Sequence, residues 1–213
     1  MGNAMAMLAM LGASVAVNAV NIRSTCAPEG ARTIRQTPSI RVYVLRARVV
    51  PGVKRVEYAC WRPTGRALLL GPVGDGPANA YRVAHVQFAS ARSTGTRSSV
   101  LAWMTVDTGA TFSFSTLRSA DVRTGRGIRE SSPPNSGAAG PSYIVTPTGS
   151  LAWIGSGGPI NKDTGFATGP TGVWAVDAAG ERLLASGIAV DLRWSAGMLT
   201  WRLNGEPGSA SLT

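Results

Sequence analysis

The chain has 213 residues, of which 26 are glycine, 13 are proline and 44% are hydrophobic. Many short apolar stretches separated by Gly and Pro, without long helical runs, exclude a helical bundle and favour a single all-β domain. The formal net charge is +10, yet Lys54 and Lys162 are the only lysines among the 21 basic residues, a skew that codon bias in a GC-rich genome produces, so the charge alone does not indicate a nucleic-acid partner.

The N-terminal segment predicts export. Residues 1–22 carry no charged side chain, and the apolar run from Ala4 to Leu11 has the length of a signal-peptide core. Small residues before the site favour a signal peptide over residues 1–19, cleaved after Ala19. An uncleaved membrane anchor is the alternative, because about twenty apolar residues just span a bilayer. Asn18 and Asn21 make this segment a poor permanent span, so we expect an extracellular or cell-envelope protein without a stable membrane span after cleavage.

The two cysteines, Cys26 and Cys60, allow a single pairing. Because disulfides form in exported proteins, we expect these two residues to be bonded. The bond would tie an irregular N-terminal arm, residues 20–39, to a strand at residues 56–61, and it would contribute roughly 3–4 kcal/mol through chain entropy. Two buried free thiols or a metal pair are the alternatives, although two thiols without a nearby His or Asp make a weak metal site.

Residues 40–213 are predicted to form one repeat domain of antiparallel strands, in about three to four units of four strands. Apolar stretches between turn residues predict strands at 40–50, 56–61, 67–71, 81–89, 99–106, 112–122, 143–146, 151–155, 173–177, 182–185, 189–194, 199–203 and 209–212. Long loops, which we expect to carry ligand contacts, are rich in Gly, Pro and Ser and lie at 71–79, 131–141 and 155–172.

Two short patterns recur along this domain. A Leu-x-Trp pattern ends at three tryptophans that lie 50 and 48 residues apart, namely Trp103, Trp153 and Trp201. Residues 63–69 look like a degenerate fourth copy, with Leu69 in the place of tryptophan. The second pattern is a strand that ends in Asp before a Gly turn, at Asp121 and at Asp177. A repeat of this length built on short strands is typical of stacked sheets such as propeller blades.

The turn and strand from Thr146 to Trp153, Thr-Pro-Thr-Gly-Ser-Leu-Ala-Trp, resemble the Ser-Pro-Asp-Gly-x-x-Ile-Ala-Phe signature of TolB-type and WD40-like propeller repeats. The chain departs from this signature at Thr148, where the signature has Asp. Over about residues 40–213 the chain resembles small exported propeller-like proteins of actinobacterial type, a largely uncharacterised group. The resemblance implies an antiparallel all-β fold like a small or incomplete β-propeller, and it implies no particular activity.

The residues that carry chemistry are few. His85 is the only histidine, so any Ser-His-Asp arrangement must use it, and its place inside a strand favours a structural or surface role. No nucleophile elbow, P-loop, zinc-protease or calcium-loop motif occurs, so we expect no catalytic residue, cofactor or metal site. Residues 105–112 resemble the Asp-box turn of sialidase-type propellers, with a faint second copy at Asp163; in that family the box is a folding element.

Two of the six tryptophans are candidate ligand contacts. Trp174 and Trp194 lie outside the Leu-x-Trp register, and exposed indoles on a rigid scaffold suit ligand stacking. The alternative for both residues is a place in the core between packed sheets.

Basic residues are concentrated near the N-terminus. Residues 23–66 hold ten basic residues against Glu29 and Glu57, which suits an acidic surface such as a cell-wall polymer, anionic lipid or nucleic acid; a solvated arginine-rich face is the alternative.

We expect a monomeric, exported, non-catalytic binding or scaffolding protein of the cell envelope, with an unknown protein or cell-wall polymer as partner and no nucleic acid. The alternatives are a carbohydrate-active hydrolase of sialidase-like propeller architecture, which needs two converging carboxyl groups, and a truncated propeller without independent function.

Overall fold

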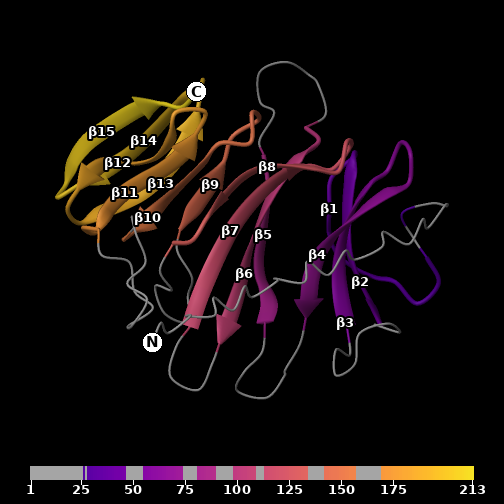
Figure 1. The fold of residues 1–213 in the computed structure, drawn as a ribbon. Coiled ribbons are helices and arrows are strands. Elements are labelled where there is room, and N and C mark those ends of the chain that lie inside the picture. Colours follow the sequence, from indigo (N-terminus) through magenta and orange to yellow (C-terminus); the bar gives the residue numbers. More distant parts are fainter. Residues whose placement is uncertain are drawn as a thin grey trace, which may run out of the picture.

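All regular structure in the described residues is β-strand. The computed structural model describes residue 26 and residues 28–46, 55–73, 81–89, 98–108, 113–133, 142–156 and 169–213. Antiparallel ladders join the strands β1 to β15 into four sheets, which confirms the all-β prediction (Figure 1). None of the described residues belongs to a helix long and apolar enough to cross a membrane. The predicted signal peptide, residues 1–19, lies outside the described residues.

Each sheet is a meander in which strands that follow one another in the chain pair with one another. Sheet 1 contains β1 (Arg32–Gln36), β2 (Ile40–Arg46), β3 (Arg55–Trp61) and β4 (Arg66–Val73). Sheet 2 contains β5 (Tyr81–Phe88), β6 (Val100–Thr108), β7 (Ser113–Asp121) and β8 (Arg126–Ser131). Sheet 3 contains β9 (Tyr143–Val145), β10 (Leu151–Gly155), β11 (Gly172–Asp177) and β12 (Gly180–Ser186). Sheet 4 contains β13 (Ala189–Ser195), β14 (Met198–Leu203) and β15 (Glu206–Ser211).

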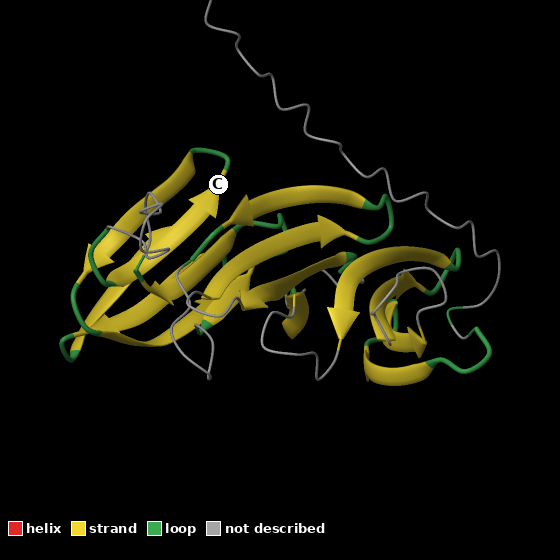
Figure 2. Cartoon of the chain, turned by 60° about the horizontal axis from the view of Figure 1, so that its bottom comes forward, coloured by secondary structure: helices red, strands yellow, loops and turns green. Residues whose placement is uncertain are grey.

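The four sheets follow one another in a row, with sheet 1 and sheet 4 at opposite ends of the molecule (Figures 1 and 2). The first and last sheets therefore do not meet to close a ring. This arrangement resembles a small, incomplete propeller of four units, as the repeat length predicted.

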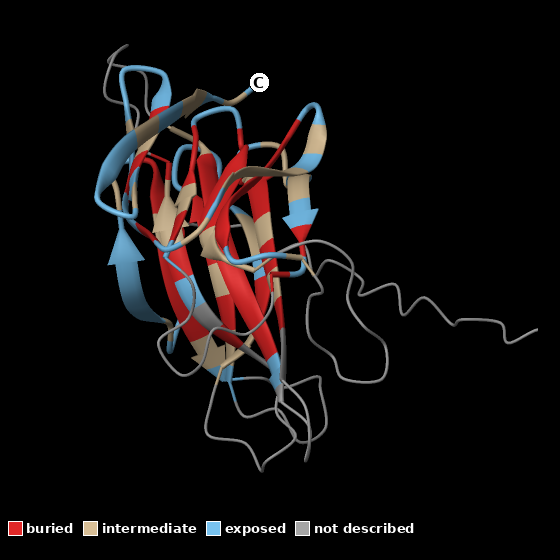
Figure 3. Ribbon diagram, turned by 90° about the vertical axis from the view of Figure 1, so that its left-hand side faces the viewer, coloured by how far each residue is buried: buried red, intermediate tan, exposed pale blue. Residues whose placement is uncertain are grey.

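Apolar side chains fill each gap between neighbouring sheets. One buried cluster lies between sheets 1 and 2, another between sheets 2 and 3, and a third between sheets 3 and 4. Buried residues run along the middle of the strands, whereas exposed residues gather at the turns and on outlying strands (Figure 3). The face of sheet 4 that points away from sheet 3 carries exposed residues such as Arg202 and Ser209, while Leu199 and Trp201 on the other face are buried. The same outer face also carries the exposed hydrophobic residues Val190 and Met198, so it is mixed in character.

The Leu-x-Trp repeat has a structural explanation. Each tryptophan lies on the second strand of its sheet and packs in the cluster shared with the preceding sheet: Trp103 with sheet 1, Trp153 with sheet 2 and Trp201 with sheet 3. The Trp103 indole also donates a hydrogen bond to the Leu70 carbonyl of sheet 1, at 3.1 Å. The repeat therefore marks the residue that fills the gap between successive sheets.

The proposed fourth copy of this repeat is structurally different. Residues 63–65 form the turn between the third and fourth strands of sheet 1, whereas the turn before Leu151 joins the first and second strands of sheet 3. A Pro-Thr-Gly turn suits many hairpins, so the similarity of the two turns does not make them equivalent.

The repeated Asp turn is confirmed. Asp121 and Asp177 each end the third strand of their sheet. The Asp121 carboxylate accepts a hydrogen bond from the Arg123 N–H, and the Asp177 carboxylate accepts one from the Ala179 N–H, both at 2.9 Å. This contact between a carboxylate and the backbone two residues later stabilises a tight turn.

Two strands were missed by the sequence prediction. Part of the arm that was expected to be irregular forms β1, which completes sheet 1 by pairing with β2. Strand β8 likewise pairs with β7. Both strands are first or last in their sheets, and every residue of β1 is exposed, so neither carries the apolar alternation on which the prediction depended.

Candidate functional site

The predicted disulfide is present in sheet 1. Cys26 and Cys60 are bonded, with their Cα atoms 5.5 Å apart. The bond lies on the face of sheet 1 that points away from sheet 2, beside the stacked rings of Tyr43 and Tyr58, whose centroids are 5.6 Å apart. Arg41 lies over the Tyr43 ring at 5.8 Å and donates a hydrogen bond to the Cys26 carbonyl. The disulfide and these contacts hold the N-terminal arm against sheet 1.

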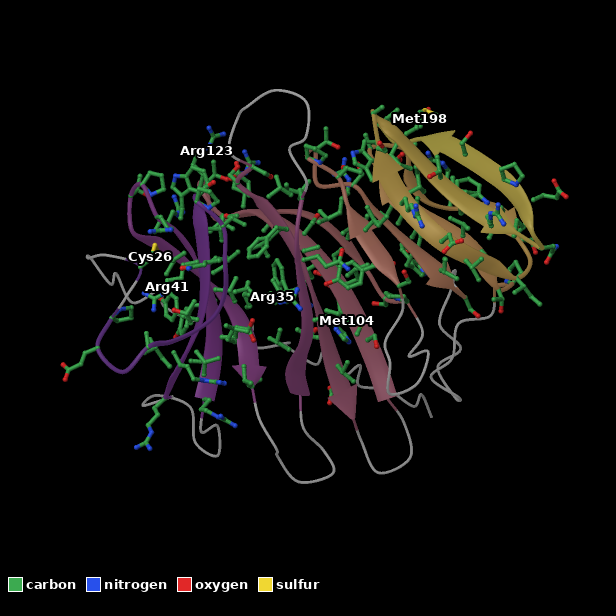
Figure 4. All side chains as sticks on the ribbon, turned by 180° about the vertical axis from the view of Figure 1, so that it is seen from behind. Cys26, Arg35, Arg41, Met104, Arg123 and Met198 are labelled. Atoms are coloured by element: carbon green, nitrogen blue, oxygen red, sulfur yellow. A yellow bond between two sulfur atoms is a disulfide. The ribbon has the colours of Figure 1, made fainter. Side chains whose placement is uncertain are left out.

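Three ionisable side chains from sheets 1 and 3 interact electrostatically. Arg35 belongs to β1, Glu57 to β3 and Tyr143 to β9. Arg35 reaches across to sheet 2, where its Nη1 donates a 2.7 Å hydrogen bond to the Val86 carbonyl (Figure 4). Glu57 is 5% exposed and Tyr143 is 3% exposed. The Tyr143 hydroxyl is buried and has no hydrogen-bond partner among the described residues.

Burial and the neighbouring charges shift the pKa values of Glu57 and Tyr143. Burial raises the pKa of Glu57 to about 7, while the positive charge of Arg35 opposes that shift. Burial also raises the pKa of Tyr143, with Arg35 lowering it and Glu57 raising it further. Near neutral pH the phenol is therefore protonated, and Glu57 changes its charge within the physiological range.

The group offers hydrogen-bond donors rather than a nucleophile. A protonated phenol, a guanidinium and, below pH 7, a neutral carboxyl can each donate to an oxygen acceptor. A raised tyrosine pKa disfavours the phenolate that nucleophilic attack would need.

Sequence reasoning treated Glu57 only as a counter-charge and did not single out Arg35 or Tyr143. Alternation in β3 places Glu57 on the same face as Ala59 and Trp61, both of which are buried. A single acidic residue on this apolar face could therefore have indicated from the sequence that Glu57 is buried. No sequence spacing links residue 35 with residue 143, because their electrostatic interaction depends on how the sheets stack.

Trp174 and Trp194, the two candidate ligand contacts, lie on different strands. Trp174 is on β11, is 7% exposed, and stacks on Trp153 with 6.5 Å between ring centroids. Its indole N–H donates to the Pro170 carbonyl at 3.0 Å. Trp194 is on β13, half-buried against the cluster between sheets 3 and 4. Both rings have core neighbours, and their contact with a ligand stays a prediction.

The remaining sequence candidates are scattered. His85 is exposed on β5. The segment that resembles an Asp-box begins in β6, and its residues 109–112 lie outside the described residues, as does Asp163. Most of the three long loops also lies outside the described residues, apart from their first and last few positions. No group of three or more His, Cys, Asp or Glu side chains in the described part of the chain is placed to hold a metal ion.

Asp177 is a second buried carboxyl, and it is fully paired. Its carboxylate receives both terminal nitrogens of Arg182, one of them at 2.8 Å, and the N–H groups of Ala179 and Thr213. The hydrogen bonds from Arg182 hold the pKa of Asp177 well below its usual range. The Thr213 carbonyl accepts hydrogen bonds from Ala178 N–H and the Ser150 hydroxyl. Asp177 therefore anchors the end of sheet 4 to sheet 3.

Sheet 1 carries a surplus of positive charge. Seven arginines lie in described residues 28–73, against Glu29 and the buried Glu57, and they are Arg32, Arg35, Arg41, Arg46, Arg55, Arg62 and Arg66. None of the seven forms an ion pair with a described acidic residue. Arg46 and Arg55 also lie directly opposite each other in the ladder between β2 and β3, a like-charge pair that disfavours folding.

Comparison of this chain with protein families, with curated proteins and with solved structures finds no match.

Proposed function

We propose that this chain is an exported, non-catalytic binding or scaffolding protein of the cell envelope. The observation that carries the proposal is the set of seven arginines of sheet 1, six of which are exposed and none of which forms an ion pair among the described residues. Exposed cations without counter-charges attract an anionic partner over a distance of about one Debye length. The disulfide supports an oxidising location outside the cytoplasm.

The charge distribution favours binding over hydrolysis. A glycoside hydrolase of the usual kind needs two carboxyl groups about 5–10 Å apart. The buried carboxyls of the described residues are Glu57 in sheet 1 and Asp177 in sheet 3, and Asp177 is neutralised by Arg182. Burial raises the pKa of Tyr143, which opposes its use as the tyrosine nucleophile of a sialidase-like enzyme.

The relationship to TolB-type and WD40-like repeat proteins belongs to the same proposal. It is supported by a row of meander sheets with an equivalent tryptophan on the second strand of sheets 2, 3 and 4. A repeat scaffold of this kind carries recognition on its turns and loops and has no need of a catalytic centre.

The test is fractionation of a secreting bacterial host that expresses the full chain, combined with a panel of fluorogenic sialosides and other glycosides. The proposal predicts oxidised protein in the envelope or extracellular fraction and no glycoside turnover. Reduced protein confined to the cytoplasm would reject export. Turnover that disappears in Glu57→Gln or Tyr143→Phe would establish the hydrolase instead.

A further inference from the structure

Two hairpin turns in neighbouring sheets present the same sequence. Thr64-Gly65-Arg66 closes the turn between β3 and β4, and Thr124-Gly125-Arg126 closes the turn between β7 and β8. The two glycines have nearly the same positive φ, 71° and 70°. Arg62 lies within the first turn and Arg123 within the second. Because sheets 1 and 2 are adjacent, equivalent turns of the two sheets lie at the same end of the stack (Figure 1).

The structure brings the two turns into contact. A Cβ atom on Gly125 would lie 2.9 Å from Nη2 of Arg66, so the guanidinium of Arg66 lies directly against the backbone of the neighbouring turn. Arg123 lies at this end of the molecule, beside sheet 1 (Figure 4). We call the four side chains Arg62, Arg66, Arg123 and Arg126 the arginine ridge.

The ridge is exposed and poorly neutralised. All four arginines are exposed. Asp121 is the only described acidic residue paired with one of them, at 3.6 Å from Arg123. Arg62 donates one long hydrogen bond, 3.4 Å, to the Thr37 carbonyl. The turn between β11 and β12 is the equivalent turn of sheet 3. There Asp177 neutralises Arg182, so the fold does not require arginines without an ion pair at such turns.

The residues around the ridge disfavour a membrane or nucleic-acid bases as its partner. Residues between the arginines are Pro63, Thr64 and Thr124, none of which supplies a large apolar side chain to enter a membrane. Trp61 beside the first turn is buried at 9% exposure, so its ring is not offered for stacking on bases. Guanidinium groups recognise carboxylate and phosphate oxygens through paired hydrogen bonds. Stacked sheets are spaced about 10 Å apart, which suits charges repeated along an extended chain.

We propose that the arginine ridge binds a linear anionic glycan polymer, whose carboxylate or phosphate groups contact the turns of sheets 1 and 2 in succession. This inference rests on the proposed envelope-binding function and names the chemistry of its ligand. The ridge contributes through charge at exposed positions, so the affinity falls as salt concentration rises.

The experiment measures the Kd of the oxidised full chain for polygalacturonate and, separately, for inorganic polyphosphate, at physiological ionic strength. The test variant is Arg66→Gln with Arg126→Gln. Its matched control is Arg193→Gln with Arg202→Gln, which removes the same charge from exposed positions of sheet 4. The Kd is expected to rise roughly tenfold in the test variant and less than about twofold in the control. Both variants are expected to unfold at the wild-type temperature, because all four side chains are exposed.

Ridge-dependent binding of polygalacturonate supports the inference. Ridge-dependent binding of polyphosphate alone would overturn it, because polyphosphate carries negative charge but no sugar. Equal loss of affinity in the test and control variants would overturn it, because net charge alone would then explain binding. Binding of duplex DNA or of phosphatidylglycerol vesicles as tightly as either polymer would also overturn it. If neither polymer binds while the protein still sediments with isolated cell envelopes, the glycan inference fails and the envelope-binding function stands.

Discussion

Glu57 and Asp177 are both buried carboxyls, but their surroundings move their pKa values in opposite directions. Burial without an ion pair among the described residues raises the pKa of Glu57 to about 7, whereas the hydrogen bonds from Arg182 lower the pKa of Asp177. The two residues therefore affect stability in different pH ranges, and each effect has a sign that a single substitution can test.

Replacement of Glu57 by Gln is expected to stabilise the protein at pH 8 and to change little at pH 4. The folded state holds the proton up to about pH 7, whereas the unfolded carboxyl loses it near pH 4.5. Stability is thus lost as the pH rises from about 4.5 to 7, by up to about 3 kcal/mol, and the amide avoids this loss. Urea unfolding at the two pH values measures the difference.

The exposed Glu130 supplies a control for that substitution. Glu130→Gln removes an acid from a surface pair with Arg118 and should change the free energy of unfolding by less than about 1 kcal/mol at both pH values. A Glu57→Gln variant that is no more stable than wild type at pH 8 would show that Glu57 is not desolvated.

Replacement of Asp177 by Asn is expected to destabilise the protein by roughly 2–4 kcal/mol at neutral pH, because it leaves Arg182 without its partner. The wild-type carboxylate contributes stability above pH 4, and this contribution is lost as the pH falls below that value, so the cost of the substitution should shrink in acid. Thermal unfolding followed by circular dichroism across this pH range measures the cost. A cost that is constant with pH would contradict the role assigned to the charge.

At the scale of strands and turns, the close approach of sheets depends on glycines at particular turns. Gly149 lies just before β10 and has a φ of 88°. A Cβ atom at this position would lie 2.5 Å from the Ile128 side chain of the neighbouring sheet. The Gly149 carbonyl also accepts a hydrogen bond from the buried Ser119 hydroxyl of sheet 2. The turn therefore joins sheets 2 and 3 as well as two strands.

Gly149→Ala is expected to cost roughly 2–4 kcal/mol, because it adds a steric clash to the strain of a positive φ. Gly180→Ala is the matched control, since Gly180 has a φ of 99° but no atom within 4 Å of its added Cβ. That variant should lose only about 1 kcal/mol. Chemical denaturation of the two variants measures both costs, and equal losses would exclude the contact with Ile128 as the cause.

The sequence predicted the buried strands well and missed strands at the edges of the sheets. The central strands β6, β10 and β11 were predicted within a few residues, because their apolar runs are buried between sheets. Strands β1 and β8 were missed because their pairing depends on backbone hydrogen bonds to a neighbour and not on apolar side chains. The disulfide followed from cysteine number, but the grouping of Arg35, Glu57 and Tyr143 depends on stacking between sheets, which local sequence does not encode.

At the scale of the whole molecule, an open row of sheets leaves its two ends without a partner sheet. The outer face of sheet 4 is exposed and carries Arg202 together with Val190 and Met198. The outer face of sheet 1 carries the Tyr43 and Tyr58 rings, covered in part by the disulfide-bonded arm. The arm and its disulfide thus take the place that a further sheet would occupy at this end.

Loss of the disulfide in the Cys26→Ser, Cys60→Ser variant is expected to lower the free energy of unfolding by about 3–4 kcal/mol, because the bond closes a loop with a sequence separation of 34. Urea unfolding with and without dithiothreitol measures this loss. The reductant should destabilise the wild type by a similar amount and leave the double variant unchanged. Equal free energies of unfolding for the oxidised and reduced wild type would show that the disulfide does not stabilise the folded protein.

Co-sedimentation of the oxidised full chain with isolated cell envelopes, at increasing salt concentration, tests envelope binding directly. We expect a bound fraction at physiological ionic strength that falls steeply with salt, because exposed arginines on sheets 1 and 2 make the contact. Absence of binding, or binding that is insensitive to salt, would contradict this expectation.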